Sequence, residues 1–244
     1  MLFLRQDIRN KFINLNIISM DTSISKIIDR ISETLNFFDF SFIVSGLLTY
    51  GIILFTVDSI ISVDYKNYNS GVIVVVSIAL VYICGLMSFS VGKFLRIKIL
   101  SAFNENYFND VFKKALKFIN SEPYEKNDEI EIYLSKDMDS YKTIYSKMWM
   151  ELRHCEEAKE TVRHLNRFWM MEAVYEGLFV SFILGVVSSI YFLCVNWCND
   201  SRLFYGMTLI LSLIATVFCF IEARRYAETQ IVEIVLTYKR FIAV

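Results

Sequence analysis

The chain has 244 residues, enough for one domain, and hydrophobic residues make up 55% of them. A soluble domain has a smaller apolar share, so the composition favours a protein that lipid covers. The formal net charge of −1 lacks the basic excess that is typical of nucleic-acid-binding proteins. A single proline, Pro123, and only eight glycines favour long uninterrupted helices.

The N-terminal segment, residues 1–38, is predicted to hold one amphipathic helix. Residues 1–20 show no continuous apolar core and no cleavage site, so we do not expect a cleavable signal peptide. Over residues 23–38 an apolar stripe recurs at helical spacing. This helix is expected to lie on the membrane surface or to pack on a neighbouring helix.

Four apolar runs are long enough to cross the hydrocarbon core, which takes about 20 helical residues. They cover residues 40–57, 71–91, 177–196 and 203–221, and none has Asp, Glu, Lys or Arg in its interior. Four buried core helices of a soluble protein are the alternative, but the rest of the chain is too small to bury them. The runs therefore predict an all-α polytopic membrane protein with four transmembrane helices in two hairpins.

The distribution of lysine and arginine predicts the orientation. The two short connections, residues 58–70 and 197–202, carry only Lys66 and Arg202. All other basic residues lie in the N-terminal, middle and C-terminal segments, which are therefore expected on the cytoplasmic side. The prediction is a multi-pass protein of a bacterial inner membrane with both termini in the cytoplasm.

The segments outside the spans predict long cytoplasmic helical extensions. Transmembrane hairpins over residues 39–92 and 173–222 flank a cytoplasmic helical hairpin over 93–172, and residues 223–244 form a C-terminal helix. The middle segment is expected to have two continuous arms, 93–120 and 139–172, each about 40 Å long, with a turn near Pro123. Residues 129–134 alternate as a short strand does.

Apolar stripes on these extensions predict association. The stripe on residues 139–172 is similar to a coiled-coil seam. Together the amphipathic helices offer more apolar surface than one chain can cover, which favours a homo-oligomer and a cytosolic protein partner. A solvated helical surface is the alternative.

Small residues recur at about four-residue spacing within the spans, where they allow close helix packing in lipid. Packing within one chain, an interface between copies and a polar pore lining are the possible uses. The candidate packing or oligomer-interface residues are Ser181, Gly185, Ser189, Gly85, Ser88 and Gly92. Ser41, Ser45 and Thr49 form a similar row in the first span.

Charged residues mark the expected cytoplasmic boundary of the third and fourth spans: Glu172, Glu176, Arg224 and Arg225. Glu176 and Arg224 could pair at one depth. Such charges either anchor the helices at the interface or form a ring at a pore mouth.

The sequence contains no pattern typical of catalysis or cofactor binding, and no cofactor or enzymatic activity is expected. His154 and His164 are too far apart on one helix to share a metal ion. Cys194 and Cys198 lie one helical turn apart, where a disulfide is awkward. Spans without ionisable groups argue against active transport and leave a gated pore open.

The second half of the chain resembles small two-span effectors of bacterial conflict systems: a cytoplasmic helix at 139–172, a membrane hairpin at 177–221 and a tail helix at 222–242. The whole layout resembles four-span membrane subunits of anti-phage systems such as the membrane component of Kiwa. The resemblance implies an oligomeric component of a defence system that senses or perturbs the membrane and couples to a cytosolic partner. An ion channel and a passive scaffold or immunity protein are the alternative functions.

Overall fold

The computed structural model describes residues 37–61, 70–121, 141–195 and 201–242. Within these ranges all the secondary-structure elements are helices and there is no strand, which confirms the predicted fold class. The helices are α2 (Phe37–Ile61), α3 (Ser70–Phe103), α4 (Tyr107–Ser121), α6 (Tyr141–His154), α7 (Lys159–Val195) and α8 (Arg202–Phe241). The chain divides after residue 40, and the residues from 41 onward form one compact unit.

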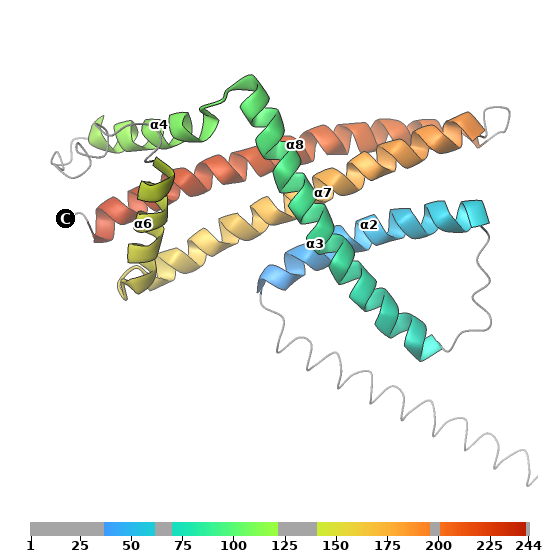
Figure 1. Cartoon of the computed structure of the whole chain (residues 1–244), viewed down its shortest axis with the longest axis horizontal. Coiled ribbons are helices and arrows are strands. Elements are labelled where there is room, and N and C mark those ends of the chain that lie inside the picture. The colour runs from blue at the N-terminus through green and yellow to red at the C-terminus, as the bar shows by residue number, and fades with distance from the viewer. Residues whose placement is uncertain (1–36, 62–69, 122–140, 196–200, 243–244) are drawn as a thin grey trace, which may run out of the picture. The chain divides into compact units, whose positions relative to one another are not determined.

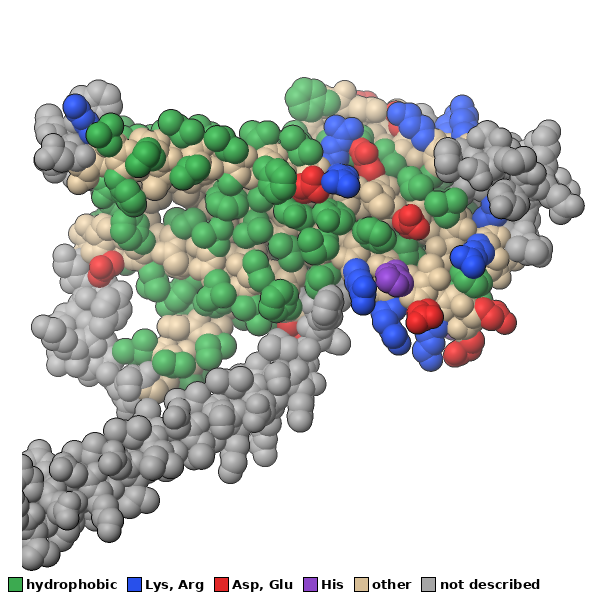
Figure 2. All heavy atoms as spheres, turned by 180° about the vertical axis from the view of Figure 1, so that it is seen from behind, with side chains coloured by type: hydrophobic (Ala, Val, Ile, Leu, Met, Phe, Trp, Pro, Cys, Tyr) green, Lys and Arg blue, Asp and Glu red, His purple; other side chains and the backbone are tan. Residues whose placement is uncertain are grey.

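Helices α7 and α8 form a long pair, and α3 crosses this pair obliquely (Figure 1). Four helices are long and apolar enough to cross a membrane: Asp39–Ile61, Gly71–Phe103, Lys159–Val195 and Arg202–Phe241. Their most apolar windows are only 6 to 28% buried inside the protein, so lipid or another chain must cover the rest. Figure 2 shows this apolar surface and the charged side chains that gather at the other end of the helices. The structure thus fits a polytopic membrane protein.

Glycines bring three of these helices into backbone contact. A Cβ added to Gly46 of α2 would overlap the carbonyl group of Val81 in α3, and one added to Gly85 would overlap that of Phe42. Further along α3, a Cβ at Gly92 would overlap the carbonyl group of Glu176 in α7. Only glycine permits these approaches, because any side chain would push the helices apart.

Hydroxyl groups join the same helices where they cross. Thr49 Oγ1 lies 2.8 Å from Ser88 Oγ and 2.7 Å from Ser181 Oγ. These three residues are at most 3% exposed, so each hydroxyl takes its partner from another helix or from the backbone. These three hydroxyl groups therefore take part in helix packing within the chain.

Both predicted arms of the middle segment are interrupted, and the expectation of two continuous arms is wrong. The first arm ends at Phe103 and restarts as α4 after a turn at residues 104–106. Asn104 Oδ1 accepts a hydrogen bond from the Asn106 backbone N–H at 3.0 Å, and Asn104 Nδ2 donates to Asp110 at 2.7 Å. These local bonds replace helical ones and start a new helix.

The second arm breaks at residues 155–158, between α6 and α7. Because of the two breaks, α4 lies beside the last part of α8, and α6 contacts the ends of both α7 and α8 (Figure 1). We call residues 104–121, 141–172 and 222–242 the head. The C-terminal helix, expected as a separate segment, is part of it.

A hydrophobic core holds the head together. It is built from Phe112, Ala115 and Leu116 of α4, Tyr141, Ile144, Met148 and Leu152 of α6, Ala158 of the turn, Leu165 of α7, and Ile231, Ile234, Val235 and Tyr238 of α8. Since α7 and α8 contribute to this core and continue as apolar helices, they join the head directly to the apolar helices.

Several predictions fall outside the described residues. These are the amphipathic helix before residue 37, the turn at Pro123, the alternating residues 129–134, most of both short connections, and Cys198.

Candidate functional site: a buried charge cluster

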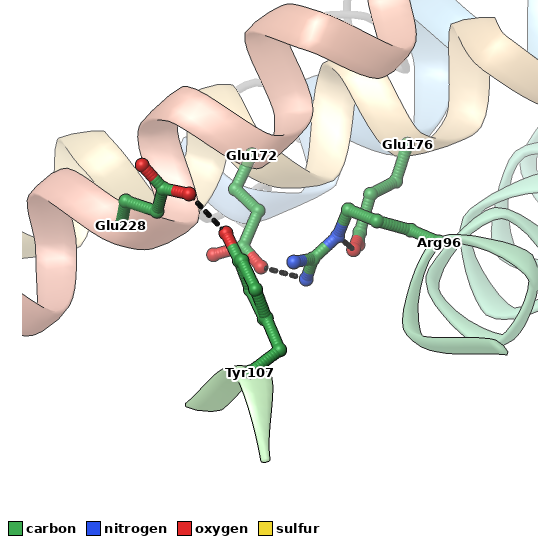
Figure 3. Close-up of polar contacts among 5 residues, drawn as sticks. All are labelled: Arg96, Tyr107, Glu172, Glu176 and Glu228. Atoms are coloured by element: carbon green, nitrogen blue, oxygen red, sulfur yellow. Dashed lines mark hydrogen bonds and ion pairs between the residues drawn. The ribbon is translucent and has the colours of Figure 1, made fainter. Parts of the chain in front are cut away.

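Arg96 of α3 binds two carboxylates of α7 where the head meets the apolar helices. Its Nη2 lies 2.5 Å from Glu172 Oε1, and its Nε lies 2.7 Å from Glu176 Oε1 (Figure 3). All three residues are buried, with 7% of Arg96, 6% of Glu172 and 1% of Glu176 exposed. We call these three residues the charge cluster.

Helix geometry explains why the cluster forms. Glu172 and Glu176 are four residues apart, so both carboxylates lie on the same face of α7. Gly92, one turn before Arg96, lets the backbone of α3 approach that of α7 at Glu176. The guanidinium group is then close enough to donate to one carboxylate through Nε and to the other through Nη2.

The charge cluster has a formal charge of −1. Arg96 supplies one positive charge against two carboxylates, and Lys93 attracts both carboxylates from one turn earlier. Within the described residues, the second carboxylate oxygen of Glu176 is buried without a hydrogen bond. Charges in such a place are costly unless they are paired, so removing one partner should be strongly destabilising.

The outer face of α3 stays apolar past the level of the cluster. Met87, Val91, Phe94 and Ile97 follow at helical spacing and are 43 to 63% exposed. Arg96, in contrast, faces α7. The cluster therefore lies behind an apolar surface of α3.

The charge cluster lies just outside the predicted spans, whose interiors hold no ionisable residue. The sequence prediction ended the second span at residue 91 and began the third at 177, whereas α3 and α7 continue without a break through the cluster. Two features of the sequence could have indicated the charge cluster: an arginine with apolar residues at 94, 95 and 97, and a pair of glutamates four residues apart.

A second polar contact links the α3–α4 turn to α8. The Tyr107 hydroxyl donates to Glu228 (Figure 3). Glu228 also accepts from Arg224 Nε at 2.8 Å. The guanidinium carbon of Arg224 lies 5.4 Å from the centre of the Tyr107 ring. Partial burial, with the hydrogen bond to Glu228 and its charge, raises the pKa of Tyr107 to about 12, so the phenol stays protonated and donates at neutral pH.

A cavity of about 500 Å³ lies between these two contacts. Arg96 and Glu172 form part of its wall, and Trp149, Trp169 and Tyr145 supply aromatic surface. Burial, and to a lesser extent the charge of Glu172, raise the pKa of Tyr145. Helix α3 and every described helix of the head contribute residues to the lining of this cavity. A change in the shape of the cavity would therefore affect the packing of all these helices.

The predicted boundary charges have other partners than expected. Glu176 binds Arg96 and not Arg224, and Arg224 binds Glu228 on its own helix. Arg225 lies on the surface, 3.4 Å from Glu222. Glu172 and Glu176 are therefore part of a tertiary contact, whereas Arg225 makes only a local contact within α8.

The predicted small-residue positions all contact another helix of the same chain. Gly85, Ser88 and Gly92 lie at the close contacts of α3 with α2 and α7. Ser181 meets Thr49, Gly185 faces Ser212 with 3.1 Å from an added Cβ to Ser212 Oγ, and Ser189 donates to Thr208 at 3.3 Å.

Metal-ligand chemistry is not found among the described residues, where no group of three or more His, Cys, Asp or Glu side chains could hold an ion. His154 Nδ1 lies 2.7 Å from the carbonyl oxygen of Met150, and Cys194 is an exposed free thiol. Comparison of the chain with models of known protein families, with curated proteins and with solved structures finds no match.

Proposed function

We propose that the protein is a multi-pass component of a bacterial inner membrane that couples a cytosolic partner to the state of its membrane helices. The charge cluster carries this proposal, because Arg96 joins α3 to α7 where the head meets the apolar helices. A partner that displaces the head would therefore act on three membrane helices together.

The continuity of the helices supports coupling. Helices α7 and α8 run from the hydrophobic core of the head into the apolar region without interruption, and α3 returns to the head through α4. Packed helices of this kind shift as rigid elements between discrete arrangements. The contact of Arg96 with Glu172 and Glu176 would stabilise one arrangement of the helices, and its loss would allow them to shift.

The proposed orientation places the head in the cytoplasm, as the distribution of lysine and arginine predicts. We also propose that several copies associate in the membrane. The low burial of the apolar helices is compatible with this, since neighbouring copies could cover surface that lipid otherwise covers. The head would then dock the cytosolic partner.

The proposed setting is anti-phage defence, which the resemblance to four-span defence subunits implies. In this setting the protein senses an envelope disturbance or opens the membrane after its partner signals. The test expresses the chain with its operon neighbours in bacteria and measures phage plaque formation and membrane potential during infection. Protection with a change of potential is expected.

Two substitutions connect this test to the charge cluster. Glu176→Gln and Arg96→Gln each leave a buried charge without one partner, and each should abolish protection while the protein still reaches the membrane. Arg225→Gln removes a charge from the same region, but from an arginine that is itself exposed, and should protect like the wild type. Full protection by both cluster variants would contradict the coupling role.

The alternative functions predict different results. An ion channel predicts conductance from the purified protein in planar bilayers, and silent bilayers over a range of voltage and pH would count against it. A passive scaffold or immunity protein predicts no effect alone and one specific toxin that it neutralises. A wild-type chain that neither limits phage nor changes the potential would contradict the defence setting.

A further inference from the structure

We propose that a groove between the α3–α4 turn and α8 binds one anionic phospholipid. The groove has a volume of about 730 Å³ and is formed by the end of α3, the first turns of α4 and the part of α8 that leaves the apolar region. This inference does not rest on the proposed function. It requires only that the apolar helices lie in lipid.

The walls of the groove suit an acyl chain. Leu100 and Phe103 of α3, Val111 of α4, and Phe220 and Val232 of α8 supply apolar surface. Phe103 is 88% exposed, although it is a large aromatic residue. Next to Phe220, the side chains of Val217 and Ile221 are 58 and 54% exposed, so the groove continues into the apolar outer surface of α8.

Two cations and two carboxylates lie at the polar part of the same groove, so their formal charges balance. Lys114 and Arg224 line it together with Asp110 and Glu228. Both acidic groups have partners: Asp110 accepts from Asn104 at 2.7 Å, and Glu228 accepts from Tyr107 and Arg224.

The two cations, in contrast, still have N–H groups that can donate to a bound ligand. Arg224 donates to Glu228 through Nε and also interacts with the Tyr107 hydroxyl, which still leaves guanidinium N–H donors. Within the described residues, Lys114 makes no ion pair. A lysine and an arginine beside an apolar groove at the membrane boundary are the groups that bind the phosphate of a lipid headgroup.

The occupant would contact Tyr107, which lies between this groove and the 500 Å³ cavity beside the charge cluster. Tyr107 and Leu100 line both spaces. A lipid in the groove would thus support the α3–α4 turn from the membrane side, where Tyr107 binds Glu228.

The test purifies the full chain in detergent, adds defined lipids and measures bound lipid by native mass spectrometry. Phosphatidylglycerol is the anionic probe and phosphatidylcholine the zwitterionic one. We expect one phosphatidylglycerol to be retained in preference to phosphatidylcholine. Inorganic phosphate should not displace it, because the acyl chain contributes to binding.

The matched variants are Lys114→Glu and Lys113→Glu, which reverse neighbouring charges on α4, of which only Lys114 lines the groove. Lys114→Glu should weaken phosphatidylglycerol retention by about tenfold, and Lys113→Glu should not. Equal retention by the two variants, or equal retention of the two lipids, would overturn the proposal.

Phe103→Cys tests a different occupant: a disulfide-linked dimer in the membrane would show that a second copy fills the groove.

Discussion

Tyr107 is a single residue that fixes the position of a whole turn. Its hydroxyl donates to Glu228 across the contact between the α3–α4 turn and α8, and its ring lies against the Arg224 guanidinium group. A hydrogen bond to a charged acceptor contributes about 1.5–3 kcal/mol to stability when it is well shielded. Tyr107 is only partly buried, so we expect the lower end of this range.

The pH dependence of stability should reveal this hydrogen bond. The pKa of Tyr107 is about 12 in the folded protein and about 10 in the unfolded chain, so its stabilising effect is complete below pH 10. Above pH 10 the unfolded state loses the phenol proton first, and the effect declines toward pH 12. Wild type should therefore exceed Tyr107→Phe in stability by about 1.5 kcal/mol below pH 10, and by less above it.

The measurement compares the free energies of unfolding of wild type and Tyr107→Phe between pH 8 and pH 11. The difference between the two proteins isolates Tyr107 from the other tyrosines, of which the chain has 14 in all. A difference that stays constant across this range would show that Tyr107 ionises alike in both states.

Arg96 shows the limit of sequence reasoning at the residue scale. The sequence predicted Glu172 and Glu176 as boundary charges, because acidic residues next to an apolar run are visible in the chain. Arg96 lies 76 and 80 residues away from them, so its pairing depends on how α3 crosses α7. That crossing depends on Gly92, and local patterns do not specify which helix a glycine will face.

Helix crossings determine the arrangement of α2, α3 and α7. Gly85→Ala places a Cβ on the carbonyl group of Phe42, and the backbone must move because a carbonyl cannot rotate away. We expect a loss of about 1–3 kcal/mol in the free energy of unfolding, measured by denaturation in mixed micelles.

Gly51→Ala is the matched control for this substitution, since nothing lies within 4 Å of a Cβ added there. Gly51 is in α2, and its replacement should leave stability unchanged or slightly raised, because alanine favours the helix. Equal losses for Gly85→Ala and Gly51→Ala would mean that the close contact of α2 and α3 does not form.

The breaks in α3–α4 and α6–α7 show what an apolar pattern can and cannot predict at the element scale. Apolar residues recur through residues 93–120, and this periodicity correctly indicates helix on both sides of the break. The polar triplet Asn104, Glu105 and Asn106 was the available sign of a turn, because asparagine side chains bond to nearby backbone groups. Which way α4 then turns depends on Phe112 and Leu116, whose burial needs α6 and α8.

The molecule as a whole combines a bundle of apolar helices with a four-helix head. Four apolar helices followed from the sequence, because a span is a local property of about 20 residues. The head could not be predicted from the sequence, since its core is assembled from side chains between residues 112 and 238 that are far apart in the chain. The charge cluster could not be predicted either, because its pairing depends on how the helices of the head and of the bundle pack together.

Hydrogen exchange of the protein in lipid nanodiscs tests most directly whether the cluster joins the two parts. Glu176→Gln leaves Arg96 with one carboxylate, and we expect faster exchange both in the last turns of α3 and in α4 of the head. Arg225→Gln should leave exchange in both regions as in the wild type. Faster exchange confined to residues next to position 176, with α4 unchanged, would contradict coupling of the head to the membrane helices through the charge cluster.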